Sequence, residues 1–364
     1  MEAAKHSPAA ADCWPIRELA ESHSPEIQAA ATLRERRFAA LHGEVKGECT
    51  LQLQREYKAW TGFGSALARL LISKGDKNLS ADDGLTIKQA IGSSYDQWAD
   101  GALTLWNWGM FDEQLHQAIA ARISDYDKYD SDGYSEQLYY YTFSQIPGSE
   151  RSRRILEVGS GSGAGLNFLS RLEPNCVFSG VDLAGQAVER ANARFSRRDR
   201  VNYLQGDAEK LPFADSTFDA VINVESSHNY PDVGAFLREV ARVLKPGGYF
   251  SFVDFFTDDR LGEFEQCRAQ VAALQTLAEH DISDAVRAAI RRRMDPHSAF
   301  RARVKKQFPL GTRFIWESSA LIQYGSHFAG QRSVWDRLPA TGLSDGLKVV
   351  AKLSSYRHLL ARKL

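Results

Sequence analysis

The chain has 364 residues, 43% of them hydrophobic and 25% charged, and its formal net charge at pH 7 is −1. These values are ordinary for a globular protein, and they give no reason to expect nucleic acid or a membrane surface as the main partner. No apolar run approaches the roughly 20 residues of a membrane span, and the N-terminal segment lacks the apolar stretch of a signal peptide. We therefore expect a cytoplasmic protein with no membrane span and no nucleic-acid partner.

The four cysteines are scattered along the chain, at Cys13, Cys49, Cys176 and Cys267, and no two of them form a Cys-x-x-Cys pair. That spacing argues against a zinc site and against a disulfide framework. We expect a reducing compartment and no bound metal.

The first part of the chain, residues 1–95, is predicted to form an N-terminal helical extension. Ser24 and Pro25 offer an N-cap and a first helical residue. The extension carries no motif, and two roles stay open for it: a lid over an acceptor pocket or the contact of a homodimer. An aromatic-rich helical segment, 96–150, follows and is expected to approach or cover the core.

Short apolar runs alternate with amphipathic segments between residues 151 and 256. Strands are predicted over 154–160, 177–183, 201–207, 218–226 and 245–255, and helices over 165–173, 184–197 and 233–244. This spacing is typical of β-α-β units. It predicts an α/β protein with a Rossmann-like, doubly wound sheet as its core.

The segment after this core is predicted to be a helical cap insertion, 257–335. Two helices are expected in it, over 260–280 and 283–294. Loops near a site commonly carry specificity, so we expect the cap to supply much of the acceptor pocket. The β-like runs of the C-terminal segment, 336–364, are expected to supply the last strands of the sheet.

A glycine-rich turn follows the first predicted strand, with Gly159, Gly161 and Gly163 at alternate positions. Such a turn lets the backbone approach a ligand and point its N–H groups at it. Gly159, Gly161 and Ala164 also satisfy the dinucleotide fingerprint G-x-G-x-x-G/A. The turn alone therefore does not choose between a redox cofactor and another nucleotide-like ligand.

Acidic residues stand at the ends of the next two predicted strands. Asp182, followed by Leu183, closes the second strand, where it could accept hydrogen bonds from a ribose diol. Asp207, followed by Ala208, closes the third strand, where it could meet the edge of an adenine. Both positions lie where doubly wound folds bind their ligands.

Residues 154–255 resemble the core of class I S-adenosylmethionine-dependent methyltransferases. Five motifs carry the resemblance in order: E-x-G-x-G-x-G from Glu157, the acid Asp182, G-D-A at Asp207, the F-D of the fourth strand, and L-K-P-G-G. A dehydrogenase would explain Gly159 and Asp182 but not the later motifs. The resemblance implies a seven-stranded sheet with S-adenosylmethionine as cofactor. It implies that the cofactor is bound by Glu157, Gly159, Gly161, Gly163, Asp182, Leu183, Asp207, Ala208, Asn223 and Tyr129.

The run E-S-x-H-x-x-P-D after the fourth strand resembles natural-product O-methyltransferases that act on sugars, polyketides or lipid-like acceptors. The resemblance implies that His228 is a general base and that Asp254 orients or assists it. Some of these relatives carry a second histidine where this chain has Asn229. We expect Asn229, Tyr230 and Tyr134 to contact the small-molecule acceptor.

A second assignment within the class is C-methylation of an isoprenoid double bond. Glu225 near the sulfonium could stabilise a carbocation, and aromatic side chains could assist through their π faces. The candidate aromatic residues for such a pocket, or for covering the cofactor, are Trp106, Tyr126, Tyr129 and Tyr134. Packing of these rings in the core of the domain is the alternative.

The segment 287–306 contains eight Lys or Arg residues and one acidic residue, Asp295. It fits either a solvated helical face or a site for a phosphorylated acceptor such as a prenyl diphosphate or a carrier-protein phosphopantetheine.

A further alternative is a scaffold or regulatory module that binds the cofactor without catalysis. The intact glycine turn and the presence of Asp182, Asp207 and His228 argue against such a decayed site.

Overall fold

A computed structural model gives the fold of the chain. It describes the following residues: 66, 80–98, 107–123, 132–149, 151, 153–302, 325–330 and 352–364. The predicted Tyr129, Trp106 and Tyr126, and most of the N-terminal extension, lie outside these residues. Within the described part of the chain no helix is both long and apolar enough to cross a membrane.

Seven strands form one sheet in the order β3-β2-β1-β4-β5-β7-β6. They are β1 (Arg154–Val158), β2 (Val177–Asp182), β3 (Val201–Gln205), β4 (Phe218–Val224), β5 (Leu244–Thr257), β6 (Leu274–Asp281) and β7 (Leu353–Lys363). The first five strands pair in parallel, whereas β7 runs antiparallel to β5 and to β6. The predicted α/β class and the seven-stranded sheet are confirmed.

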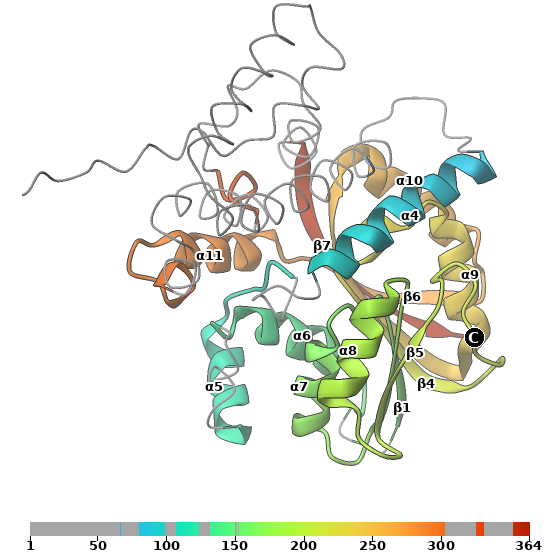
Figure 1. The fold of residues 1–364 in the computed structure, drawn as a ribbon, viewed down its shortest axis with the longest axis horizontal. Helices are drawn as coiled ribbons and strands as arrows, with labels where there is room; N and C mark the ends of the chain where they lie inside the picture. Colours follow the sequence, from blue (N-terminus) through green and yellow to red (C-terminus); the bar gives the residue numbers. More distant parts are fainter. Residues whose placement is uncertain are drawn as a thin grey trace, which may run out of the picture.

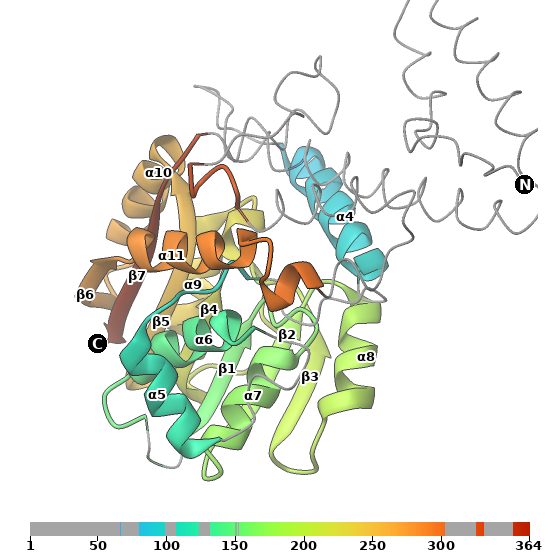
Figure 2. The same ribbon diagram turned by 90° about the vertical axis from the view of Figure 1, so that its left-hand side faces the viewer.

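Helices cover both faces of this sheet. They are α4 (Ala81–Trp98), α5 (Glu113–Arg122), α6 (Tyr134–Ser144), α7 (Ala164–Leu172), α8 (Gly185–Phe195), α9 (Val233–Val243), α10 (Asp258–Ala269) and α11 (Ser283–Met294). The helices α6, α7 and α8 pack on one face, and α9 and α10 on the other (Figure 1 and Figure 2). α4 lies above the carboxyl ends of the strands in both views.

Two hydrophobic clusters fill the space between the sheet and its two helical layers. Neighbouring residues of one strand enter different clusters, Ile155 the first and Leu156 the second, because successive side chains of a strand point to opposite faces. α9 shows why a helix forms here. Asp232 caps it by accepting a hydrogen bond from the Ala235 N–H at 2.7 Å, and its apolar stripe is buried against the sheet.

The predicted helix over 260–280 is wrong after Ala269. α10 ends there, and Leu274–Asp281 form the edge strand β6, which pairs with β7. Most side chains of β6 are exposed, so its sequence has no alternating apolar pattern to mark a strand. Pairing with β7 provides its backbone hydrogen bonds instead, and tertiary context overrides local propensity. One of the last strands therefore comes from the cap insertion and not from the C-terminal segment.

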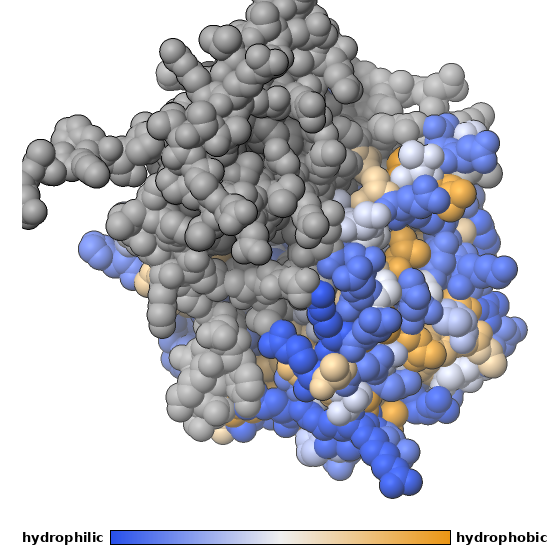
Figure 3. Space-filling model, in the orientation of Figure 1, coloured by the Kyte–Doolittle hydropathy of each residue, from blue (hydrophilic) through white to orange (hydrophobic). Residues whose placement is uncertain are grey.

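The described surface is mostly hydrophilic on the face drawn in Figure 3, including the outer side of α4. Among the described residues, the exposed large hydrophobic side chains are Leu85, Leu277 and Leu364. The apolar residues of the domain are thus largely used in the two clusters beside the sheet.

His358 is a fully buried histidine on β7, the strand between β5 and the edge strand β6. Ser251 Oγ donates to the Thr142 carbonyl at 2.6 Å, so its lone pair accepts from His358 Nε2 at 3.0 Å. His358 Nδ1 has no hydrogen-bond partner among the described residues. Burial, assisted by the nearby His280, lowers the pKa of His358 from 6.5 to about 3. The ring is therefore neutral in the folded protein.

This burial predicts a loss of stability in mild acid. Below pH 6.5 the unfolded chain protonates His358 while the folded chain does not, so the free energy of unfolding falls as the pH falls, by up to about 1.4 kcal/mol per pH unit. Between pH 7 and pH 5 we expect the free energy of unfolding of His358→Gln, measured by urea titration, to fall by about 2 kcal/mol less than that of the wild type. The exposed His297→Gln variant is the matched control. An equal decrease of the free energy of unfolding in all three proteins would contradict the assignment of His358 as a buried, neutral histidine.

Candidate active site

An open cavity of about 840 Å³ lies at the carboxyl ends of β1, β2, β3 and β4. The strand order reverses between β1 and β4, and open α/β sheets bind ligands at such a switch point. Its walls come from the glycine turn, the loops after β2, β3 and β4, and the inner side of α4. A concave site of this kind, where the loops after several parallel strands converge, is where such sheets hold small molecules or cofactors.

The glycine turn after β1 forms the floor of the cavity. Gly159, Gly161 and Gly163 have φ angles of 77°, 49° and 78°, a region that other residues rarely adopt. A Cβ at Gly159 would lie 1.9 Å from Ser226 Oγ. The turn therefore requires glycine at this position both for its backbone angle and for the close approach of the loop after β4.

Glu157 is fully buried on β1 and lies beneath this turn. Its Oε1 accepts a hydrogen bond from Tyr139 Oη at 2.7 Å, and its Oε2 has no partner among the described residues. Burial raises the pKa of Glu157 to about 8. Tyr139 lines the cavity, whereas Glu157 does not.

Asp182 ties the glycine turn to the loop after β2. Its Oδ2 accepts from the Gly161 N–H at 2.7 Å and its Oδ1 from the Ala184 N–H at 2.9 Å. Burial raises the pKa of Asp182, against the effect of these backbone hydrogen bonds. Asp182 and Leu183 both line the cavity, as the sequence predicts for cofactor-binding residues.

Asp207 and Ala208 also line the cavity, after β3. Asp207 Oδ1 accepts from the Glu209 N–H at 2.9 Å, and its Oδ2 lies 2.6 Å from Lys88 Nζ on α4. No motif in the sequence points to Lys88. A lone lysine on a helix 119 residues before Asp207 carries no local signal for this contact.

Asn223 and Tyr230 are close together but differ in their relation to the cavity. Asn223 is fully buried, and its Nδ2 donates to the Val158 carbonyl at 2.8 Å and to Tyr230 Oη at 3.0 Å. Tyr230 lines the cavity and Asn223 does not. Asn223 thus joins β4 to β1 and holds the Tyr230 hydroxyl beside the glycine turn.

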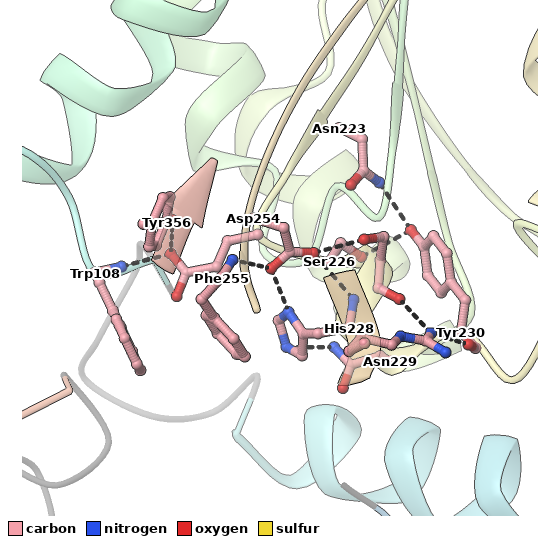
Figure 4. Close-up of polar contacts among 12 residues, drawn as sticks. Trp108, Asn223, Ser226, His228, Asn229, Tyr230, Asp254, Phe255 and Tyr356 are labelled. Carbon is pink, nitrogen blue, oxygen red and sulfur yellow. Dashed lines mark hydrogen bonds and ion pairs between the residues drawn. The ribbon is translucent and has the colours of Figure 1, made fainter. Parts of the chain in front are cut away.

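The structure brings His228 and Asp254 together in a buried pair (Figure 4). His228 lies in the short 3-10 turn Ser227–Asn229 after β4, and Asp254 lies on the neighbouring β5. His228 Nδ1 is 2.8 Å from Asp254 Oδ1, while Asp254 Oδ2 accepts from Ser227 Oγ at 2.7 Å and from the His228 N–H at 3.0 Å. The imidazole stacks on Phe255 with ring centroids 4.2 Å apart.

These contacts orient the imidazole. An ionised carboxylate only accepts hydrogen bonds, so Asp254 requires the proton on Nδ1 of His228 and leaves Nε2 as the nitrogen that can take up a proton. Asn229 Nδ2 lies 3.0 Å from this Nε2 and also 3.3 Å from Tyr95 Oη on α4. Asn229 and Tyr95 line the cavity, whereas His228 lies directly behind Asn229.

Glu225, the first residue after β4, lines the cavity in an unusual conformation. Its φ is 51°, which is uncommon for a residue other than glycine and is typical of functional sites. Its Oε2 accepts from the Trp108 N–H at 2.6 Å and from Tyr356 Oη at 2.7 Å. Burial raises the pKa of Glu225 well above its ordinary value. No local sequence pattern predicts the contacts of Trp108 and Tyr356 with Glu225, because these residues lie 117 and 131 positions away from it.

Tyr134 lies at the start of α6, away from the residues that line the cavity. Its ring meets Phe111 edge-on, with centroids 6.0 Å apart, and Arg293 lies 5.5 Å from its centroid. Tyr134 is half-buried there, between α6, α11 and the segment before α5.

The basic segment contributes a buried cation near the site. Arg293 on α11 is 3% exposed, pairs through two nitrogens with Asp132 at 2.6 and 2.8 Å, and donates to the Trp108 carbonyl. The solvated-face interpretation of the segment is therefore wrong for Arg293. The N–H of the same residue, Trp108, donates to Glu225. Arg293 therefore helps to fix the backbone segment that positions Glu225.

Comparison with known proteins agrees with this geometry. Residues 156–252 match the methyltransferase domain family. A fatty-acid O-methyltransferase from Mycolicibacterium smegmatis is 42% identical over 150 residues, covering 41% of this chain and 53% of that protein. A phthiotriol/phenolphthiotriol dimycocerosates methyltransferase from Mycobacterium leprae is 38% identical over 146 residues, covering 40% of this chain and 53% of that protein. The chain spans about half the length of these relatives.

Among solved structures, the cyclase SpnF has the same fold. It is 18% identical and superposes with a TM-score of 0.52, covering 76% of this chain and 96% of its own. The fold, the cavity at the switch point and the family match agree with the class I S-adenosylmethionine-dependent methyltransferase core that residues 154–255 resemble. Proteins of that class bind S-adenosylmethionine and transfer its methyl group.

The residues around the cavity fit this cofactor. Two buried polar atoms of residues that line the cavity, Ser160 Oγ and Asn229 Oδ1, have no hydrogen-bond partner among the described residues. A ligand with an ammonium group and hydroxyls would satisfy such atoms, since buried polar groups are otherwise costly. Gly159 and Gly161 line the cavity without a side chain, which lets a ligand approach the backbone of the turn closely.

Proposed function

We propose that the protein transfers a methyl group from S-adenosylmethionine to a hydroxyl of a small, lipid-like molecule. The buried His228–Asp254 pair behind the wall of the cavity is the observation that carries the proposal, because O-methylation needs a group to take the proton of the acceptor. The two relatives support the acceptor class: one is named for fatty acids and the other for phthiotriol.

The cofactor would be held by the loops that line the cavity. In this proposal Asp182 binds the ribose hydroxyls, Asp207 with Ala208 meets the adenine, and the glycine turn approaches the methionine part above the buried Glu157. When bound, S-adenosylmethionine would supply an electrophilic methyl group, which an acceptor oxygen would attack in line with the breaking sulfur–carbon bond, with S-adenosylhomocysteine as the leaving group.

His228 would accept the proton that the acceptor hydroxyl releases. Asp254 fixes the ring with Nδ1 protonated and stabilises the imidazolium that results once Nε2 is protonated. Since Asn229 Nδ2 already lies 3.0 Å from Nε2, the acceptor hydroxyl must replace this contact before the proton can move. Asn229 and Tyr230, which both line the cavity, are then positioned to bind the acceptor.

The donor site is tested by replacing Asp182. We expect Asp182→Ala to weaken the binding of S-adenosylhomocysteine at least about 100-fold in calorimetric titration, because the carboxylate would bind the ribose and also holds Gly161. The matched control is Asp259→Ala, an exposed carboxylate in the first turn of α10. Unchanged affinity in Asp182→Ala would contradict the assignment of Asp182. A well-folded wild type that fails to bind would overturn the proposed donor.

C-methylation of an alkene is the second candidate. A specific observation favours it: Glu225 accepts hydrogen bonds from Trp108 and Tyr356, and Trp108 stacks on Phe255 with centroids 4.8 Å apart. A carboxylate beside aromatic faces can stabilise a carbocation. Glu225→Gln distinguishes the two reactions. A severe loss of turnover in this variant, with near-normal turnover in His228→Ala, would establish C-methylation.

A further inference from the structure

One side of α4 touches the loops that line the cofactor cavity at four positions spaced four residues apart. These positions are Gly84, Lys88, Gly92 and Asp96. They meet Pro231 after β4, the Asp207–Glu209 pair after β3, Leu183 after β2, and the Gln186 N–H at the start of α8. A four-residue spacing places side chains on one face of a helix, so the contacts form a single stripe.

At Gly84 and Gly92 the backbone of α4 comes close to these loops. A Cβ at Gly84 would lie 3.7 Å from Pro231 Cβ, and one at Gly92 would lie 3.8 Å from Leu183. Interior glycines also destabilise a helix, by about 1 kcal/mol each relative to alanine. The position of α4 therefore depends on its anchors, of which the ionic one is at Lys88.

Lys88 Nζ lies 2.6 Å from Asp207 Oδ2 and 2.6 Å from Glu209 Oε2, and its side chain is 20% exposed. Burial would lower the pKa of Lys88, but the hydrogen bonds to Asp207 and Glu209 outweigh burial and leave the pKa raised. Lys88 is thus charged at neutral pH, and it offsets the repulsion between two neighbouring carboxylates. Without Lys88, α4 would lose both of its ion pairs with the loop after β3.

Lys88 also lines the cavity, together with Ile91, Gly92 and Tyr95 of the same helix. We propose that Lys88 is a positioning residue that clamps α4 over the cofactor and slows the release of the cofactor. This inference rests on the proposed placement of the cofactor between the glycine turn and Asp207. Glu209 does not line the cavity, so it affects a bound cofactor through Lys88 and the loop rather than by contact.

The test compares four variants with the wild type: Lys88→Met, Lys88→Arg, Glu209→Gln and the double variant Lys88→Met/Glu209→Gln. The dissociation rate of S-adenosylhomocysteine is measured by stopped flow. We expect Lys88→Met to raise this rate about tenfold, because truncating one member of a partly buried charge pair acts mainly on dissociation. Lys88→Arg should stay near the wild type, and the double variant should be no worse than Lys88→Met.

Hydrogen exchange of the cofactor-free proteins gives a second readout that is independent of binding. The amides of 81–98 should exchange faster in Lys88→Met, while those of β1 and β4 stay unchanged. The matched control is Lys210→Met, which removes the same charge from an exposed side chain three residues from Asp207.

The outcomes separate this inference from the proposed function. Dissociation and exchange in Lys88→Met equal to those in Lys210→Met would overturn the role of Lys88 while leaving the donor site intact. Additive effects in the double variant would also overturn it, since Lys88 and Glu209 would then act independently. Failure of the folded wild type to bind S-adenosylhomocysteine would overturn the proposed function, and the clamp on the cofactor with it.

Discussion

Replacing His228 by alanine is expected to lower turnover by about 10²- to 10⁴-fold, the usual range for loss of a general base. The affinity for S-adenosylhomocysteine should change little, because His228 lies behind Asn229 and not among the residues that line the cavity. Turnover is measured with saturating S-adenosylmethionine and hydroxylated lipid acceptors, and affinity by calorimetry. The expected pattern is a loss in kcat with a nearly unchanged dissociation constant for the cofactor.

Two further variants make this result specific. Asp254→Asn should also lower kcat, because an amide no longer restricts the proton of His228 to Nδ1. His297→Ala removes an exposed histidine and should behave as the wild type. Turnover of His228→Ala within a few-fold of the wild type would contradict the assignment of the base.

Replacing Arg293 by methionine is expected to lower the free energy of unfolding by about 2–4 kcal/mol, since it removes the guanidinium that contacts Asp132 through two nitrogens in a largely buried ion pair. The variant also frees the Trp108 carbonyl and loosens the loop whose N–H holds Glu225. The measurement is urea denaturation of the cofactor-free protein, read as a shift of the midpoint at constant m-value.

Arg291→Met on the same helix is the matched control, because its side chain is exposed; its stability should stay within about 0.5 kcal/mol of the wild type. Arg293→Lys should recover only part of the loss, because a lysine does not reproduce the two-pronged contact with Asp132. If Arg293→Met unfolds at the same urea concentration as Arg291→Met, the buried pair does not stabilise the domain.

Local pattern was enough to predict most of the core. The runs around Ile155, Phe178 and Val221 are buried strands as predicted, because each carries its own apolar signal. Gly159 and Asp182 were also predictable, since a tight turn and a strand-end acid are encoded within a few residues. β6 was not predictable in this way, because its exposed side chains leave no pattern and β7 supplies its pairing.

In the candidate active site, too, some residues could be predicted from the sequence and others could not. His228 and Asp254 lie 26 residues apart, but His228 follows β4 and Asp254 lies on β5, and these two strands are parallel neighbours in the sheet. That the two residues act together is what the resemblance to O-methyltransferases implies. The structure adds that Asn229, and not His228, faces the cavity.

The fold class, the resemblance that implies the donor, and the short-range parts of the candidate site could be predicted from the sequence, because each of them depends on neighbouring residues. Packing between distant elements was needed to show which further groups complete the candidate site: Lys88 beside Asp207, Tyr356 and Trp108 on Glu225, and Arg293 beside Trp108. Each of these contacts closes a loop of about 100 residues or more. Such contacts depend on how α4 and α11 pack on the sheet and on where β7 pairs within it. No local sequence pattern records either arrangement.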